Sequence, residues 1–162
     1  MLKKSFPLVI LLFIAFIQST ILNRIRVHNV QPDLLLLTTV FFTLLQRRKN
    51  RISPLIFALS AGLLKDVFSG NILGINASSF VILILVIEAY RQKIYSEHLI
   101  SYFLVSFFSS LFVSFFHYFF IRPLPPFRES LYAIILPFSI YTALFSVPYF
   151  YLLKRLFVVH RE

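Results

Sequence analysis

The chain has 162 residues, of which 59% are hydrophobic and only 14% are charged, and its mean hydropathy is +0.84. A soluble domain typically has about a quarter of its residues charged, so this composition argues strongly against a soluble protein. The apolar residues form long blocks instead of single helix faces, as expected of helices surrounded by hydrocarbon. The absence of cysteine excludes disulfides, thiol nucleophiles and thiolate metal sites.

The formal net charge of +10 would also suit a nucleic-acid-binding protein, but the basic residues lie in short clusters between the apolar blocks. No basic helix, zinc motif or RNA-binding motif accompanies them. Basic residues at membrane edges fix the topology of the chain and contact anionic headgroups. We therefore expect anionic lipids, and no nucleic acid, as partners.

The apolar blocks predict an all-α membrane protein with about six transmembrane helices in one domain, residues 1–162. The first block follows two lysines, as in a signal peptide, but no small-residue cleavage site follows it, so we interpret it as an uncleaved helix. The second block places Pro32 in its first turn and Asp33 at the positive end of the helix dipole. Pro137 and Pro148 are expected to bend the last helix. The expected helices cover residues 6–22, 30–45, 52–68, 75–90, 99–121 and 131–153.

Ionisable residues within these blocks recur near one side of the membrane. Asp33, Lys65, Asp66 and His117 all lie near the outer ends of their helices if the N-terminus is cytoplasmic, and Gln18 reaches the same level. A charge in the membrane interior costs about 3 kcal/mol on insertion scales, so such residues usually pair or face a cavity. Two interpretations stay open: a cluster in which Lys65 pairs with Asp33 or Asp66, or separate side chains that snorkel to the headgroups.

The three glycines of the chain, Gly62, Gly70 and Gly74, all lie within thirteen residues. Gly62 shares one helix face with Ala58 and Asp66, because these residues are four apart. Small residues on such a face let a neighbouring helix approach closely. Gly70 and Gly74 suit a turn that needs a positive φ or close backbone contact, and Asn76 follows this turn.

Three serines, Ser106, Ser110 and Ser114, are also four apart, in a block rich in phenylalanine. This stripe of small residues predicts a tight helix contact, either within the chain or with a partner protein. The alternative is that each serine donates only to a carbonyl of its own helix.

Nothing in the sequence indicates catalysis. The four histidines lie in separate segments, and no clustered carboxylates, glycine-rich phosphate loop or nucleophile elbow accompany them. We therefore expect no enzyme activity, no metal site and no cofactor.

Three short stretches of the sequence are distinctive. Residues 32–37 read Pro-Asp-Leu-Leu-Leu-Leu, residues 62–66 read Gly-Leu-Leu-Lys-Asp, and residues 73–77 read Leu-Gly-Ile-Asn-Ala. Together they resemble the MreD family of bacterial rod shape-determining membrane proteins. The chain is also similar to this family in its length and in its pattern of six helices. The motifs are short, so the family resemblance depends on their combination.

The resemblance implies a non-enzymatic scaffold subunit of the cell-elongation complex, a multi-pass protein of the bacterial cytoplasmic (inner) membrane. Its implied partners are the single-span protein MreC, the cytoskeletal protein MreB, a SEDS glycosyltransferase and a class B penicillin-binding protein. The resemblance further implies a fold like that of the substrate-binding S component of energy-coupling-factor transporters.

Such an S component is the nearest alternative function, because it is also small, basic and built from six helices. A vitamin site needs convergent polar side chains, often with Trp, and this chain has no Trp. The scaffold interpretation is therefore preferred. A third alternative is that the outer polar cluster holds the headgroup of a lipid or polyprenyl carrier.

The short loops predict the orientation, because eleven basic residues fall on the side of the two termini and four on the opposite side. The positive-inside rule then places both termini in the cytoplasm. A cysteine introduced at Arg48 or Lys93 should stay unlabelled by an impermeant thiol reagent in intact cells, and one at His28 or Pro125 should be labelled. External labelling at position 48 would contradict this topology.

Overall fold

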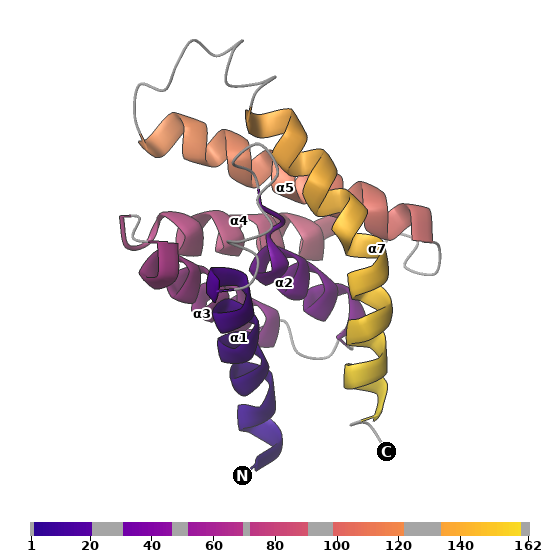
Figure 1. Ribbon diagram of the computed structural model, residues 1–162. Coiled ribbons are helices and arrows are strands. Elements are labelled where there is room, and N and C mark those ends of the chain that lie inside the picture. The colour runs from indigo at the N-terminus through magenta and orange to yellow at the C-terminus, as the bar shows by residue number, and fades with distance from the viewer. Residues whose placement is uncertain are drawn as a thin grey trace.

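The computed structural model describes residues 2–20, 31–46, 52–69, 72–90, 99–121 and 134–159. No strand occurs within these ranges, which confirms the prediction of an all-helical protein. Six helices make up the described structure, and Figure 1 shows them labelled along the chain: α1 (Leu2–Thr20), α2 (Leu34–Leu45), α3 (Ile52–Ser69), α4 (Ile75–Tyr90), α5 (Leu99–Ile121) and α7 (Leu136–Val159).

Three helical segments of the described chain are long and apolar enough to cross a membrane: Ile52–Ser69, Ile100–Phe120 and Leu136–Arg155. The described segments Val9–Thr20, Leu34–Leu45 and Ile75–Tyr90 are apolar but shorter. A helix needs about 20 apolar residues to cross the hydrocarbon core by itself. Six membrane crossings, with both termini in the cytoplasm, therefore stay a prediction.

The second helix starts later than the sequence predicted. Asp33 is the N-cap residue of α2, and its side chain accepts a hydrogen bond from the backbone N–H of Leu36 at 3.1 Å. Because helical geometry begins only after the N-cap, Pro32 precedes the helix. The prediction that Pro32 lies in the first helical turn was wrong.

The last helix extends beyond the predicted end at residue 153, because α7 runs to Val159. Residues 131–133, where the predicted range begins, lie outside the described residues, and Ile134 and Ile135 have π-helical geometry directly before α7. Pro137 is the second residue of α7. Pro148 is inside the helix, near its middle. Figure 1 shows α7 changing direction partway along its length, as expected of a helix with an internal proline.

Helix α2 lies at the centre of the bundle and contacts α1, α3, α4, α5 and α7 (Figure 1). Ten of its twelve residues are buried, because it is apolar on all sides. Its Phe41 ring packs edge-on against Tyr102 of α5 and Phe150 of α7, with centroids 5.7 and 5.4 Å apart. Twelve residues span only about 18 Å, less than the thickness of the hydrocarbon core. The other helices therefore shield a short central helix from lipid.

The outer faces of the surrounding helices carry large exposed hydrophobic side chains. Examples are Phe13 of α1, Val67 of α3, Phe108 of α5 and Leu144 of α7. Apolar surface of this extent is unusual on a soluble monomer and is expected where a helix meets lipid or another membrane protein. The exposed faces thus agree with a membrane location.

Gly62 lies where α3 and α4 pack most closely. A Cβ atom added to Gly62 would lie 2.4 Å from the Cα atom of Ala77 and 2.8 Å from the carbonyl oxygen of Asn76. Both neighbours are backbone atoms, so no side-chain rotation can relieve the overlap. The close helix contact that the small-residue spacing predicted is therefore the contact with α4.

Replacing Gly62 with Ala should thus separate α3 from α4 and lower the free energy of unfolding by about 1–3 kcal/mol. The control is Leu63→Ala, which removes an exposed side chain from the next position of the same helix. Thermal unfolding of the purified variants in detergent measures the difference. Equal midpoints for Gly62→Ala and the wild type would contradict the close backbone contact.

Candidate functional site

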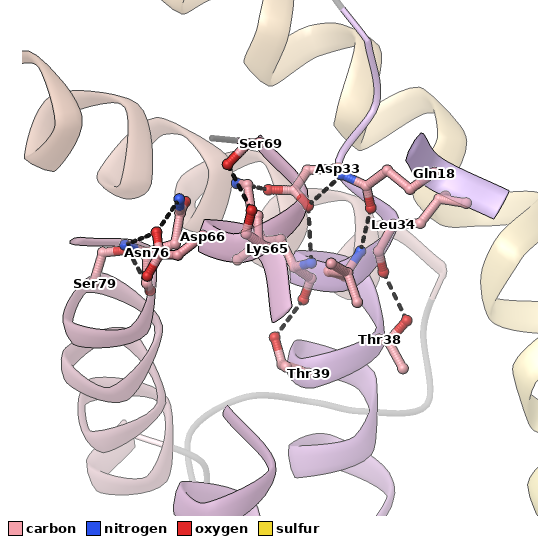
Figure 2. Close-up of polar contacts among 12 residues, drawn as sticks. Gln18, Asp33, Leu34, Thr38, Thr39, Lys65, Asp66, Ser69, Asn76 and Ser79 are labelled. Atoms are coloured by element: carbon pink, nitrogen blue, oxygen red, sulfur yellow. Dashed lines mark hydrogen bonds and ion pairs between the residues drawn. The ribbon is translucent and has the colours of Figure 1, made fainter. Parts of the chain in front are cut away.

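Two buried carboxylates lie at the starts of two helices, and each residue is only 1% exposed. Asp33 comes immediately before α2, and Asp66 comes from the last turns of α3 and reaches the start of α4 (Figure 2). The first N–H groups of a helix have no acceptor within the helix. Where the helix start is buried away from water, the protein itself must supply acceptors for them. Both carboxylates meet that need.

Asp66 accepts four hydrogen bonds from residues 74–77, around the beginning of α4. Its Oδ2 atom accepts the backbone N–H of Gly74 at 2.8 Å and that of Ala77 at 3.3 Å. Its Oδ1 atom accepts the backbone N–H of Asn76 at 3.1 Å and the side-chain amide Nδ2 of Asn76 at 2.7 Å. Gly74 has a φ of +101°, a conformation that favours glycine. A carboxylate of one helix therefore caps the next helix.

Asp33 joins three helices at a second point of the same cluster. Its Oδ1 atom accepts a bond from the side-chain Nε2 of Gln18 at 3.2 Å, and the Oε1 atom of Gln18 accepts the backbone N–H of Leu35 at 3.0 Å. Its Oδ2 atom forms an ion pair with the ammonium of Lys65. That ammonium also lies 5.1 Å from the ring centroid of Phe80 in α4. Gln18, Asp33 and Lys65 thus join α1, α2 and α3 through polar side chains, and Lys65 also contacts α4 at the ring of Phe80.

This geometry decides between the two interpretations of the ionisable residues. Lys65 pairs with Asp33 inside the protein, and its side chain is 15% exposed. Asp66, its neighbour in sequence, bonds to backbone and amide N–H groups instead. Lys65 and Asp33 therefore pair with each other and do not snorkel separately, and Asp66 belongs to a second set of bonds at the start of α4. His117 is half-buried, and its Nε2 atom has no hydrogen-bond partner among the described residues.

Helices α5 and α7 pack against each other, and Ser110 of the serine stripe reaches α7. Ser106 and Ser110 are fully buried, and Ser114 is half-buried. The hydroxyl of Ser110 donates to the carbonyl of Phe107 in its own helix at 2.9 Å and lies 3.5 Å from the carbonyl oxygen of Ser139 in α7. Packing between helices and bonding within the helix therefore occur together at this serine.

The remaining predicted site residues are placed only in part. Pro32 and Asn76 are buried, whereas Gly70 lies outside the residues that the structure describes. Sequence reasoning missed the hydrogen bond of 2.7 Å between the hydroxyls of Thr38 and Tyr149, which links α2 to α7. Hydroxyl side chains within apolar helices were the available signal, but nothing in the sequence pairs residues 111 positions apart. Among the described residues, no group of three or more His, Asp and Glu side chains could hold a metal ion.

The helical fold, the exposed apolar faces and the buried polar cluster together define a helical membrane protein. The family described as rod shape-determining protein MreD matches residues 2–158, nearly the whole sequence. The chain therefore belongs to the MreD family, as the three motifs predicted. Comparisons with curated proteins and with solved structures give no match. The likeness to S components accordingly gains no support from the comparisons.

The ion pair of Lys65 with Asp33 leads to a stability prediction. Lys65→Met should leave the buried carboxylate without its cation and lower the free energy of unfolding by about 3–5 kcal/mol. Adding Asp33→Asn should restore part of this loss, because asparagine is uncharged and can still cap α2. The control is Lys154→Met, which changes an exposed lysine of α7. Thermal unfolding in detergent tests the series, and a double variant no more stable than Lys65→Met would argue against the pair.

Proposed function

We propose that this MreD-family protein is a non-enzymatic scaffold subunit of the bacterial cell-elongation complex. It binds an MreC-like single-span protein in the inner membrane and couples MreB to peptidoglycan synthesis. A SEDS glycosyltransferase and a class B penicillin-binding protein are its further partners. Membership of a rod shape-determining family supports the cell-shape role.

The observation that supports the scaffold role is that the two buried carboxylates bond to helices of their own chain. Asp66 accepts four bonds from the start of α4, and Asp33 bonds to α1, α2 and α3. These bonds fix the relative positions of the helices. A subunit that holds several proteins in register needs such a fixed arrangement, because mobile helices would have to be ordered at each binding event.

The same observation weighs against a vitamin site built from these two carboxylates. A binding site needs polar groups that converge on a ligand. The oxygen atoms of Asp33 and Asp66 instead accept bonds from their own chain. A vitamin would have to break the caps of α2 and α4 to use them.

Asp66→Ala tests the scaffold role in cells. The variant leaves buried N–H groups at the start of α4 unpaired, each at a cost of about 1–3 kcal/mol. In a strain that lacks the wild-type gene, it should widen or round the cells and reduce co-purification of the MreC-like protein several-fold. Vitamin uptake should stay unchanged. Ser60→Ala, which removes a partly exposed hydroxyl from the same helix, is the control.

The amount of variant protein in the membrane must be measured beside cell width, because loss of the cap also destabilises the fold. A second variant, Asp66→Asn, keeps one oxygen acceptor and should give intermediate cell width and intermediate recovery of the partner. Normal rods with normal recovery of the partner in Asp66→Ala would remove this residue from the scaffold. Normal rods with lost vitamin uptake would favour a transporter instead.

A further inference from the structure

A hollow of about 190 Å³ opens beside the ion pair of Lys65 and Asp33. Its walls come from the end of α1, the residues around the start of α2 and the end of α3. At about 30 Å³ per water, it has room for roughly six water molecules or a small polar group of that size. The described residues that line it are Ala15, Gln18, Ser19, Gln31, Leu35, Lys65, Phe68 and Ser69.

Lys65 is the one charged residue among the described residues that line this hollow. Asp33, its ion-pair partner, does not line the hollow. A lysine ammonium has three N–H donors, and the ion pair with Asp33 needs only one of them. The pair therefore holds the ammonium in place while donors remain for a second acceptor.

The other polar lining residues supply hydrogen-bond acceptors. The hydroxyl of Ser19 donates to the carbonyl of Phe16 at 3.0 Å, and the hydroxyl of Ser69 donates to the carbonyl of Lys65. Each hydroxyl oxygen keeps lone pairs that can accept a bond. A fitting ligand thus carries one anionic group and several hydroxyl donors.

An exposed apolar side chain also lines the hollow. Phe68 of α3 is one of the lining residues and is 47% exposed. Its ring is suited to contact an acyl chain, whereas Lys65, Ser19 and Ser69 provide the polar part of the lining. A molecule with a phosphate, neighbouring hydroxyls and hydrocarbon chains would satisfy all three surfaces.

We propose that this hollow binds the headgroup of an anionic phospholipid whose phosphate carries a glycerol group. The phosphate accepts from Lys65, and the glycerol hydroxyls donate to Ser19 and Ser69. A phospholipid with an ethanolamine headgroup fits less well, because its ammonium would lie close to Lys65. The shared chemistry, a phosphate ester with adjacent hydroxyls, also occurs in soluble glycerol phosphate. The proposal does not depend on the scaffold role.

The test uses the full chain in nanodiscs that contain equal amounts of phosphatidylglycerol and phosphatidylethanolamine. Native mass spectrometry after release from the nanodisc counts the retained lipids. The variant Ser69→Leu fills the hollow from an exposed position at the end of α3. Ser60→Leu is the matched control, because Ser60 also donates to the carbonyl four residues earlier in α3 but does not line the hollow.

The wild type and Ser60→Leu should retain phosphatidylglycerol over phosphatidylethanolamine by at least fivefold, and Ser69→Leu should lose this preference while it stays folded by circular dichroism. Equal retention of the two lipids by the wild type would overturn the proposal. An unchanged preference in Ser69→Leu would also overturn it. Added glycerol 3-phosphate distinguishes the sources: no displacement supports a membrane lipid, and full displacement at equal concentration overturns the assignment to a lipid.

Discussion

The arrangement of this protein depends on the hydrogen bonds that Asp66 accepts at the start of α4. Inside a membrane there is no water to pair with the free N–H groups at a helix start, so the protein must supply acceptors. An ionised carboxylate suits this place, because its hydrogen bonds are stronger than those of a neutral group and the helix dipole favours negative charge there. Asp33 performs the same task for α2. Two short helices can therefore begin at buried positions within the protein.

Helix α3 connects these two caps because Lys65 and Asp66 are adjacent in sequence but point to different helices (Figure 2). Lys65 reaches the cap of α2, and Asp66 reaches the start of α4. Gly62 lies one turn before Asp66 on the same face of α3. It keeps the distance from the Asp66 side chain to the start of α4 short. Without a side chain at Gly62, the backbone of Ala77 lies within van der Waals contact of α3. Close packing and capping thus depend on each other.

Much of the fold could be predicted from the sequence. Long apolar blocks locate the helices, and charged residues near the ends of these blocks indicate that their side chains lie near one side of the membrane. Gly62 was recognised as a packing position from its spacing to Ala58 and Asp66. The motifs that indicated the MreD family contain the capping residues themselves, so part of their chemistry was visible. The groups within the chain that these residues contact were not visible in the sequence. A helix that is apolar on every side gives no signal for which face meets which neighbour, so neither the contact of Gly62 with α4 nor the pairing of Thr38 with Tyr149 could be derived.

The use of polar groups within the fold also constrains how a scaffold of this kind binds its partners. The buried carboxylates are committed to helix starts, whereas the outer helix faces carry side chains such as Phe13 and Leu144. Lipid solvates these faces as well as a protein would, so apolar area alone gives little preference for a partner helix. Specific association in a membrane then depends on shape, which requires that the helices do not shift relative to one another. The capped and paired side chains supply that rigidity, and this links the buried residues Asp33, Lys65 and Asp66 to the proposed assembly.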